Sequence, residues 1–456
     1  MSMSLRQRHL SMIALGGVIG AGLFVGTGAG IAVAGPGILV SFTLAGLLAL
    51  LVMRMLAEMA AEYPSRGAFS VHAEKALGQW AGFTVGWVYW STVVVVLAVE
   101  ATGAATLATS WWPAIPQWAW VLLFMSVLTA VNLAPVRSFG EFEFWFAALK
   151  VAAIIIFLIL GGLAIFGLLP DTSAVGFTNL RDFLPHGWGG VAAGLLAVVF
   201  AFGGIEVVTI AAADAEDPKR AVGKAVRSSM FRLLVFYLGS MVVIVTLLPW
   251  DSAEVGASPY VAVLDRIGVP GAGQIMNVVV FVALLSAINA TLFGAARMLY
   301  SLAERGEAPR KMLDTWHGVP RYAVLASTAF GFVSVVLNLL WPDTIFLYLL
   351  NAVGSALLVV WAFVAVSELR LRRTMVAPAV PMWGYPYLTW LALAGMGGVI
   401  VLMLLDDQAR VQILSTAVLV LVVLAFSRFV HRAGSPDAPP AAAVQDPAPA
   451  RPRDGA

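Results

Sequence analysis

The chain of 456 residues contains no cysteine, which excludes structural disulfides and thiolate metal sites. Charge is scarce as well, because only 11% of the residues are charged, whereas a soluble domain carries about a quarter. Hydrophobic residues make up 61% of the chain, and the mean hydropathy is +0.91. This composition predicts a polytopic membrane protein. The net charge of +2 says little about partners, and because no basic run resembles a nucleic-acid footprint, we expect no nucleic-acid partner.

Motifs of common enzymes are missing too. The sequence has no P-loop and no HExxH, and it has no nucleophile elbow in a suitable context. The histidines His72, His186 and His317 fall in expected loops without metal-ligand spacing. We therefore expect no enzyme activity, no metal and no cofactor. We also expect no cleavable signal peptide, because the apolar segment after the basic stretch 2–9 is long and lacks a cleavage-like end.

Long apolar segments are abundant. A bilayer core about 30 Å thick requires about 20 apolar residues for each spanning helix. Of the 27 Lys and Arg residues, three lie in expected outward loops (Arg181, Arg266, Arg410) and two within segments (Arg54, Lys150), which leaves 22 on the cytoplasmic side. This bias predicts that both termini are cytoplasmic. The twelve segments expected to span are approximately 11–34, 36–60, 82–106, 117–135, 145–168, 190–213, 228–249, 273–299, 321–341, 344–367, 386–405 and 411–430.

Glycines interrupt the first and the sixth of these segments near their centres, within 13–26 and 198–207. Matching interruptions in two halves of a chain point to the binding site of a secondary transporter. The predicted fold is therefore an all-α membrane protein of twelve transmembrane helices. It has an inverted 5+5 repeat (helices 1–5 and 6–10), broken helices 1 and 6, and the appended helices 11–12. We expect a transmembrane domain over 1–432, followed by a disordered, dispensable Pro/Ala-rich cytoplasmic tail over 433–456.

The break in helix 1 falls at Gly20, Ala21 and Gly22. Glycines make unwinding inexpensive, and an unwound turn exposes N–H groups that favour a carboxylate. Tight helix packing through small residues is the alternative interpretation. The matching break at Phe202-Gly-Gly204 favours a binding site, over which the Phe202 ring would close.

Five further residues carry polar groups into apolar segments. Glu100, deep in helix 3, would attract a substrate ammonium or carry a proton, or else be a protonated packing residue; Glu206 has a similar position after the second break. Lys150 in helix 5 suits reversible protonation, unless its side chain snorkels to the cytoplasmic face. Ser286 and Asn289 in helix 8 would line the pathway, or else hydrogen-bond between helices.

Several stretches together resemble the amino acid–polyamine–organocation (APC) superfamily. The first two resemble the superfamily in general, and the other four its bacterial amino acid transporter family, with GABA (4-aminobutyrate) permeases the most similar. The stretches are GGVIGAGLF (16–24), AEMAAEYPSRGAF (57–69), GEFEFWFAALKV (140–151), FGGIEVVTIAAA (202–213), FYLGS (236–240) and ARMLYSLAERGEAP (296–309).

The resemblance implies a role for each matching position. The backbone of Ile19, Gly20, Ala21, Gly22 and Leu23 would bind the substrate carboxylate. Carbonyls of Phe200, Ala201 and Gly203 would receive the amino group, with Phe202 as the gate. Lys150 would replace a sodium ion found in sodium-coupled relatives, which implies proton coupling together with Glu100.

The expected function is therefore import of an amino acid or related zwitterion across the cytoplasmic membrane, by proton symport with alternating access. GABA is the first candidate for the substrate. Sodium symport, amino acid exchange on the same fold, and a non-transporting nutrient sensor remain alternatives. The expected partners are the substrate, a proton and the lipid bilayer. The sequence leaves the exact amino acid, the stoichiometry and the oligomeric state open.

Overall fold

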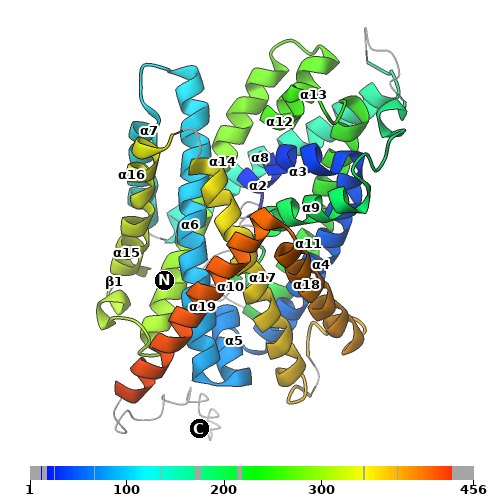
Figure 1. The fold of residues 1–456 in the computed structure, drawn as a ribbon. Coiled ribbons are helices and arrows are strands. Elements are labelled where there is room, and N and C mark those ends of the chain that lie inside the picture. The colour runs from blue at the N-terminus through cyan, green and yellow to red at the C-terminus, as the bar shows by residue number, and fades with distance from the viewer. Residues whose placement is uncertain are drawn as a thin grey trace, which may run out of the picture.

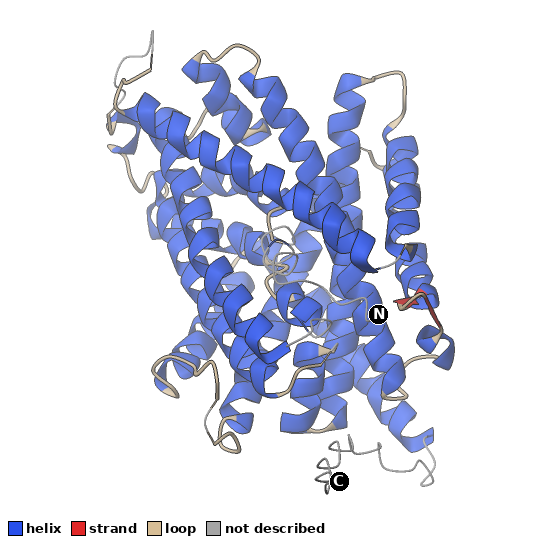
Figure 2. Cartoon of the chain, turned by 180° about the vertical axis from the view of Figure 1, so that it is seen from behind, coloured by secondary structure: helices blue, strands red, loops and turns tan. Residues whose placement is uncertain are grey.

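The chain folds into a bundle of helices that run mostly along one common direction (Figures 1 and 2). The computed structural model describes residues 12, 18–24, 26–65, 67–134, 136–169, 176–212, 218–342, 345–376 and 378–433. Within these ranges the strands are β1 (Thr315–Trp316) and β2 (Val319–Pro320), which pair antiparallel. The expected C-terminal tail lies outside the described residues from 434 onward.

Helices occupy every apolar segment expected from the sequence, and the first, sixth and ninth are divided into pieces. The α-helices are α2 (Ala21–Phe24), α3 (Gly26–Ala34), α4 (Ile38–Glu62), α5 (Ala68–Leu77), α6 (Gln79–Trp111), α7 (Gln117–Leu133), α8 (Val136–Ile165), α9 (Gly187–Val199), α10 (Val207–Ala212), α11 (Pro218–Leu247), α12 (Ala253–Ala257), α13 (Pro259–Ile267), α14 (Ala272–Glu304), α15 (Arg321–Gly331), α16 (Val333–Leu340), α17 (Ile345–Leu371), α18 (Tyr387–Leu405) and α19 (Asp407–Ala433). The 3₁₀ turns are η1 (Gly35–Gly37), η2 (Thr178–Leu180), η3 (Phe200–Phe202) and η4 (Arg310–Leu313).

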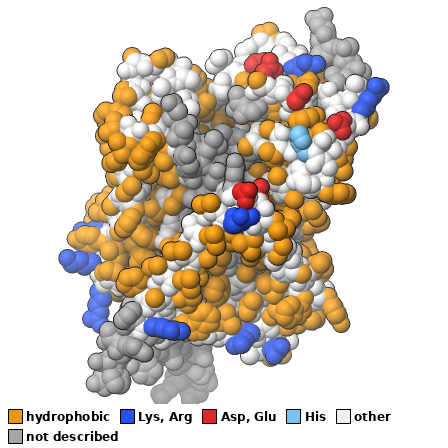
Figure 3. Space-filling view, in the orientation of Figure 1, with side chains coloured by type: hydrophobic (Ala, Val, Ile, Leu, Met, Phe, Trp, Pro, Cys, Tyr) orange, Lys and Arg blue, Asp and Glu red, His pale blue; other side chains and the backbone are white. Residues whose placement is uncertain are grey.

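The helices are apolar enough for a bilayer. Among the described residues, eight helical stretches are long and apolar enough to cross a membrane, and three shorter apolar helices accompany them. Hydrophobic side chains cover much of the face in Figure 3, and Lys and Arg side chains lie toward its lower end, at its upper right and near its middle. The chain is therefore a multi-pass helical membrane protein.

Some helices exceed the segments read from hydropathy. α8 begins at Val136, nine residues before the expected start, and α11 begins at Pro218, ten residues before. Backbone hydrogen bonds extend a helix beyond the hydrocarbon, whereas the hydropathy signal ends where charged residues begin. The short helices α5, α12 and α13 were not expected, because they are too short to give a spanning signal.

The interior of the bundle is built around α6, which packs on α14 and α17, and around α4, which packs on α11. The short helices α3 and α9 lie side by side, so the two interrupted segments meet inside the bundle (Figure 1). Large side chains such as Trp361, Tyr89 and Tyr260 are fully buried there. This packing places both helix breaks in the protein interior, away from lipid.

Candidate functional site

The first break covers Val18, Ile19 and Gly20, which do not form helix, and α2 begins at Ala21. Both Val18 and Ile19 are buried, so their carbonyl groups need partners from elsewhere in the bundle. The ammonium of Lys150 on α8 donates to the Ile19 carbonyl at 3.0 Å. The non-helical backbone is thus satisfied by side chains from other helices, as irregular backbone at membrane depth requires.

The second break follows α9, where η3 leads into turns over residues 203–206 and α10 begins at Val207. Gly204 has φ +93°, a conformation in which a side chain is strained. Its N–H group lies 3.3 Å from Oε1 of Glu206, whose carboxylate accepts this hydrogen bond. The Thr209 hydroxyl donates to the Glu206 carbonyl at 2.7 Å. Glu206 therefore stabilises the start of α10.

The two breaks touch each other closely. A Cβ added to Gly22 would lie 2.6 Å from Cα of Ala201, so α2 and η3 approach each other backbone to backbone. The buried hydroxyl of Tyr237 on α11 lies 2.9 Å from the carbonyl oxygens of both Val18 and Ala201. Because a phenol has one proton, Tyr237 donates to one of these carbonyls at a time. Tyr237 therefore bridges the two broken segments.

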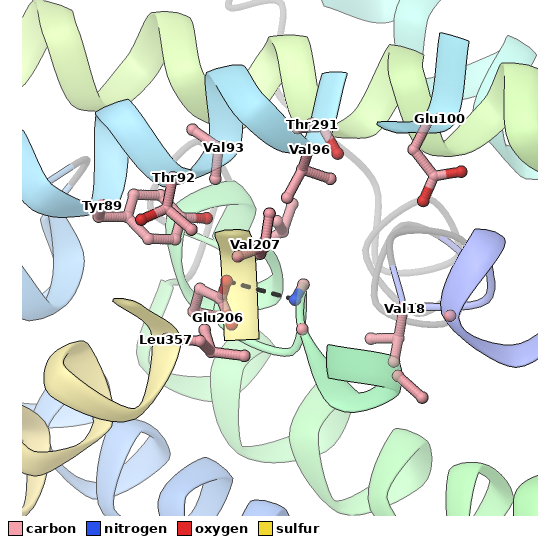
Figure 4. A pocket seen from close by; sticks show the side chains of 15 residues that line it. Val18, Tyr89, Thr92, Val93, Val96, Glu100, Glu206, Val207, Thr291 and Leu357 are labelled. Carbon is pink, nitrogen blue, oxygen red and sulfur yellow. Dashed lines mark hydrogen bonds between the residues drawn. The ribbon is translucent and has the colours of Figure 1, made fainter. Parts of the chain in front are cut away.

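A pocket lies between these breaks and the helices α6, α14 and α17 (Figure 4). Its volume of about 40 Å³ holds a few water molecules, so the pocket must widen to admit an amino acid. Tyr89 and Glu206 lie toward one side of the view, and Glu100 and Val18 toward the other. The residues that line it are Val18, Gly22, Tyr89, Thr92, Val93, Val96, Glu100, Ala201, Gly203, Gly204, Glu206, Val207, Thr291, Val353 and Leu357.

Two carboxylates and one ammonium lie at or beside this pocket. Glu100 is 4% exposed and lies against the first break, because a Cβ on Gly20 would be 2.6 Å from its Oε1 atom. Glu206 is 3% exposed at the second break. Lys150 is completely buried and is within electrostatic reach of Glu100 and of Glu143. Its hydrogen bond to the Ile19 carbonyl directs the ammonium inward, which contradicts the snorkelling alternative.

Ser286 and Asn289 are absent from the residues that line the pocket. The Ser286 hydroxyl donates to Glu143 Oε1 at 2.7 Å, and the Asn289 amide donates to Glu143 Oε2 at 3.4 Å. The Asn132 side-chain amide on α7 in turn donates to Oδ1 of Asn289 at 2.8 Å. The structure therefore agrees with the alternative of interhelical hydrogen bonding for both residues.

Glu143 and Tyr237 were not singled out in the sequence. Glu143 precedes Lys150 by seven residues, a spacing that places both on one face of α8. This spacing was the available signal, but hydropathy placed the start of the helix beyond Glu143. Tyr237 lies in an otherwise apolar stretch and gives no comparable signal.

Phe202 is 2% exposed and packs against Tyr237 and Phe42, with ring centroids 5.0 Å and 6.1 Å away. It is not among the residues that line the pocket in this conformation. Phe200 lies in η3, and its carbonyl belongs to the second break. The expected backbone positions of both breaks thus lie together, whereas the expected gate packs toward α4.

Two interrupted helices that meet beside a pocket lined by two buried carboxyl groups are typical of the class of multi-pass membrane transporters. The family model for amino acid permeases matches residues 9–434, so the chain belongs to the amino acid permease family of the APC superfamily. The match confirms the resemblance found in the sequence motifs and indicates a transporter rather than an enzyme.

Two relatives share the same identity with the chain. It is 47% identical over 429 residues to the gamma-aminobutyric acid permease of Bacillus subtilis, covering 92% of both chains. It is also 47% identical over 437 residues to the aromatic amino acid transport protein AroP of Corynebacterium glutamicum, covering 92% of this chain and 94% of the relative. The gamma-aminobutyric acid permease of Escherichia coli is 41% identical over 429 residues, covering 92% of both chains.

Proposed function

We propose that the chain imports an amino acid or related zwitterion by proton symport with alternating access. The observation that supports this proposal best is the 3.0 Å hydrogen bond from the buried Lys150 ammonium to the Ile19 carbonyl, at the break that borders the pocket. If Lys150 gains or loses a proton, its hydrogen bond to the Ile19 carbonyl changes, and with it the backbone that would bind the substrate. Protonation and substrate binding are thereby linked through one short contact.

The substrate would bind between the two breaks. The backbone N–H groups of 19–23 would receive its carboxylate, and the carbonyls of Phe200, Ala201 and Gly203 its amino group. Because Glu100 lies beside Gly20, an ionised Glu100 would repel a carboxylate bound at this break. Glu100 therefore binds a proton before the substrate carboxylate enters, and Phe202 swings over the bound molecule.

The two relatives that are 47% identical to the chain are named for different substrates. Sequence identity alone therefore does not distinguish GABA from aromatic amino acids. The side chains around the pocket support the smaller substrate. The aliphatic residues Val93, Val96, Val353 and Leu357, with the small residue Thr291, leave little width in the closed pocket. We therefore propose GABA or a similarly slender zwitterion, which requires less widening than an aromatic ring.

The proton would be carried by Lys150, Glu100 and Glu206, all buried near the breaks. The membrane potential supplies about 2.3 kcal/mol per charge per 100 mV. At about 100 mV, one proton carried with a zwitterion therefore supports roughly 50-fold accumulation. Sodium symport on the same fold remains the alternative, and the Lys150 side chain argues against it because its ammonium already places a positive charge at the Ile19 carbonyl.

We further propose twelve spans with the inverted 5+5 repeat and both termini in the cytoplasm. The helices coincide with the twelve apolar segments, and the excess of Lys and Arg in the expected cytoplasmic loops supports this orientation. Bacterial relatives in the permease family support a location in the cytoplasmic membrane.

Uptake of labelled GABA into sodium-free proteoliposomes, under an imposed inward proton gradient, tests the proposal. Accumulation that a protonophore abolishes would establish proton symport, and competition by unlabelled amino acids would rank the substrates. Uptake that requires sodium would refute proton coupling. Uptake that occurs only after the vesicles are preloaded with an amino acid would identify an exchanger. Binding without uptake of any amino acid in the panel would identify a sensor.

A further inference from the structure

A second cluster of buried charged side chains lies away from the pocket, where α4, α17 and the α17–α18 connection meet. Glu58 belongs to the last two turns of α4, and Glu368 is three residues from the end of α17. Both glutamates are 0% exposed, and neither lines the pocket. The helix ends that carry them lie toward the lower end of the bundle in Figure 1.

Glu58 has two partners that fix the α17–α18 connection to α4. Its Oε1 atom is 3.0 Å from Nη1 of Arg372, which follows α17 directly. Its Oε2 atom accepts a hydrogen bond of 2.9 Å from the backbone N–H of Met382. Arg54, one turn earlier on α4, donates from Nε to the Pro381 carbonyl at 2.9 Å. Two α4 side chains therefore hold the same loop.

Glu368, unlike Glu58, has no ion pair and no backbone N–H donor among the described residues. Both of its carboxyl oxygens are buried, and the side chains of Glu58 and Thr389 lie beside them. An ionised carboxylate in such surroundings costs several kcal/mol. Two adjacent carboxylates raise the cost further, because one charge opposes the ionisation of the other. Three groups interact with the Glu368 carboxyl group. They are Glu58 on α4, Thr389 on α18 and Arg372 in the α17–α18 connection.

We propose that Glu58 and Glu368 form a proton-binding site, in which the protonated Glu368 donates to Glu58 and thereby fastens α17 and the α17–α18 connection to α4. When the proton leaves Glu368 for water, two carboxylates face each other, while Arg372 makes an ion pair with one of them. The repulsion loosens the contact between Glu58 and the N–H of Met382. The site goes beyond the proposed transport function and does not depend on the substrate.

The absence of native cysteine allows a direct test on the purified full-length chain. A single cysteine in place of Met382, which is 5% exposed, reports opening of the connection through its rate of reaction with a maleimide. A single cysteine in place of the fully exposed Val376 corrects for the increase in thiolate with pH. The ratio of the two rates is measured from about pH 6 to about pH 9, where buried glutamates can titrate.

We expect this ratio to rise roughly tenfold with pH, the change produced by losing one charge-assisted hydrogen bond. Glu368→Gln keeps an N–H donor toward Glu58 at every pH, so the ratio should stay low and flat. Glu58→Gln leaves one carboxyl, which Arg372 neutralises, so the pH dependence should also vanish. An equal rise in the Glu368→Gln background overturns the proposal, as does a flat ratio in the chain with both glutamates.

Discussion

The closest contact between the two helix breaks predicts the effect of one added methyl group. Gly22→Ala would place a Cβ 2.6 Å from Cα of Ala201, and 3.3 Å from its Cβ and backbone N. Carbon atoms are most stable about 3.5–4.0 Å apart, so the two segments must separate by about 1 Å. Because the neighbour is backbone, no side-chain rotation relieves the contact.

Added methylenes in a packed interior typically cost about 1–3 kcal/mol. This cost corresponds to a roughly 5- to 150-fold lower population of the conformation in which the two breaks are in contact. The separation also lengthens the contacts of Tyr237 with Val18 and Ala201, which are 2.9 Å each. We therefore expect the initial rate of proton-driven uptake by Gly22→Ala to fall by about 5- to 150-fold.

The assay compares uptake per reconstituted molecule in proteoliposomes, with the melting temperature in detergent as a check on folding. Gly162→Ala on α8 is the matched control, because a Cβ at Gly162 meets nothing within 4 Å. This control should transport at the wild-type rate. A folded Gly22→Ala carrier that also transports at the wild-type rate would refute the backbone contact between the breaks.

Three further outcomes are expected. Lys150→Ala, which removes the donor to the Ile19 carbonyl, should reduce proton-driven accumulation more than substrate binding; normal accumulation in vesicles would contradict its role in coupling. Tyr237→Phe leaves a buried carbonyl without its donor, so uptake should slow by about 5- to 100-fold while the variant stays folded, and an unchanged rate would count against the bridge. Burial lowers the pKa of His72, on α5 outside the spans, from its ordinary 6.5 to about 4. The unfolded chain therefore binds this proton first as the pH falls, and about 3 kcal/mol of stability is lost between pH 6.5 and about pH 4. The melting temperature of His72→Gln should fall less than that of the wild type over this pH range. An identical fall in the wild type and in His72→Gln would contradict this role of His72.

Much of the candidate site was visible in the sequence because its signals are local. Glycines at 20 and 22 and at 203 and 204 mark the two breaks, and the structure places both beside one pocket. Glu100 and Glu206 stood out as charges within apolar runs, and both line that pocket. A charge or a glycine within an apolar run is unusual in itself, whatever it contacts.

The contacts of neutral polar residues were not visible in the same way. Ser286 and Asn289 would suit either the pathway or interhelical bonding, and their contact with Glu143 joins positions more than 140 residues apart. Tyr237 looks like any aromatic residue of an apolar helix until its distances to Val18 and Ala201 are measured. Such partners depend on how the helices pack.

The sequence alone therefore determined that the protein is a multi-pass membrane transporter with interrupted helices, because insertion into a bilayer depends on the apolar length and charge of each segment. Only the tertiary structure decided that Lys150 binds the Ile19 carbonyl and that Glu58 lies beside Glu368. The physical reason is that hydrogen bonds and ion pairs act over a few ångströms, and only packing brings residues more than a hundred positions apart within that distance.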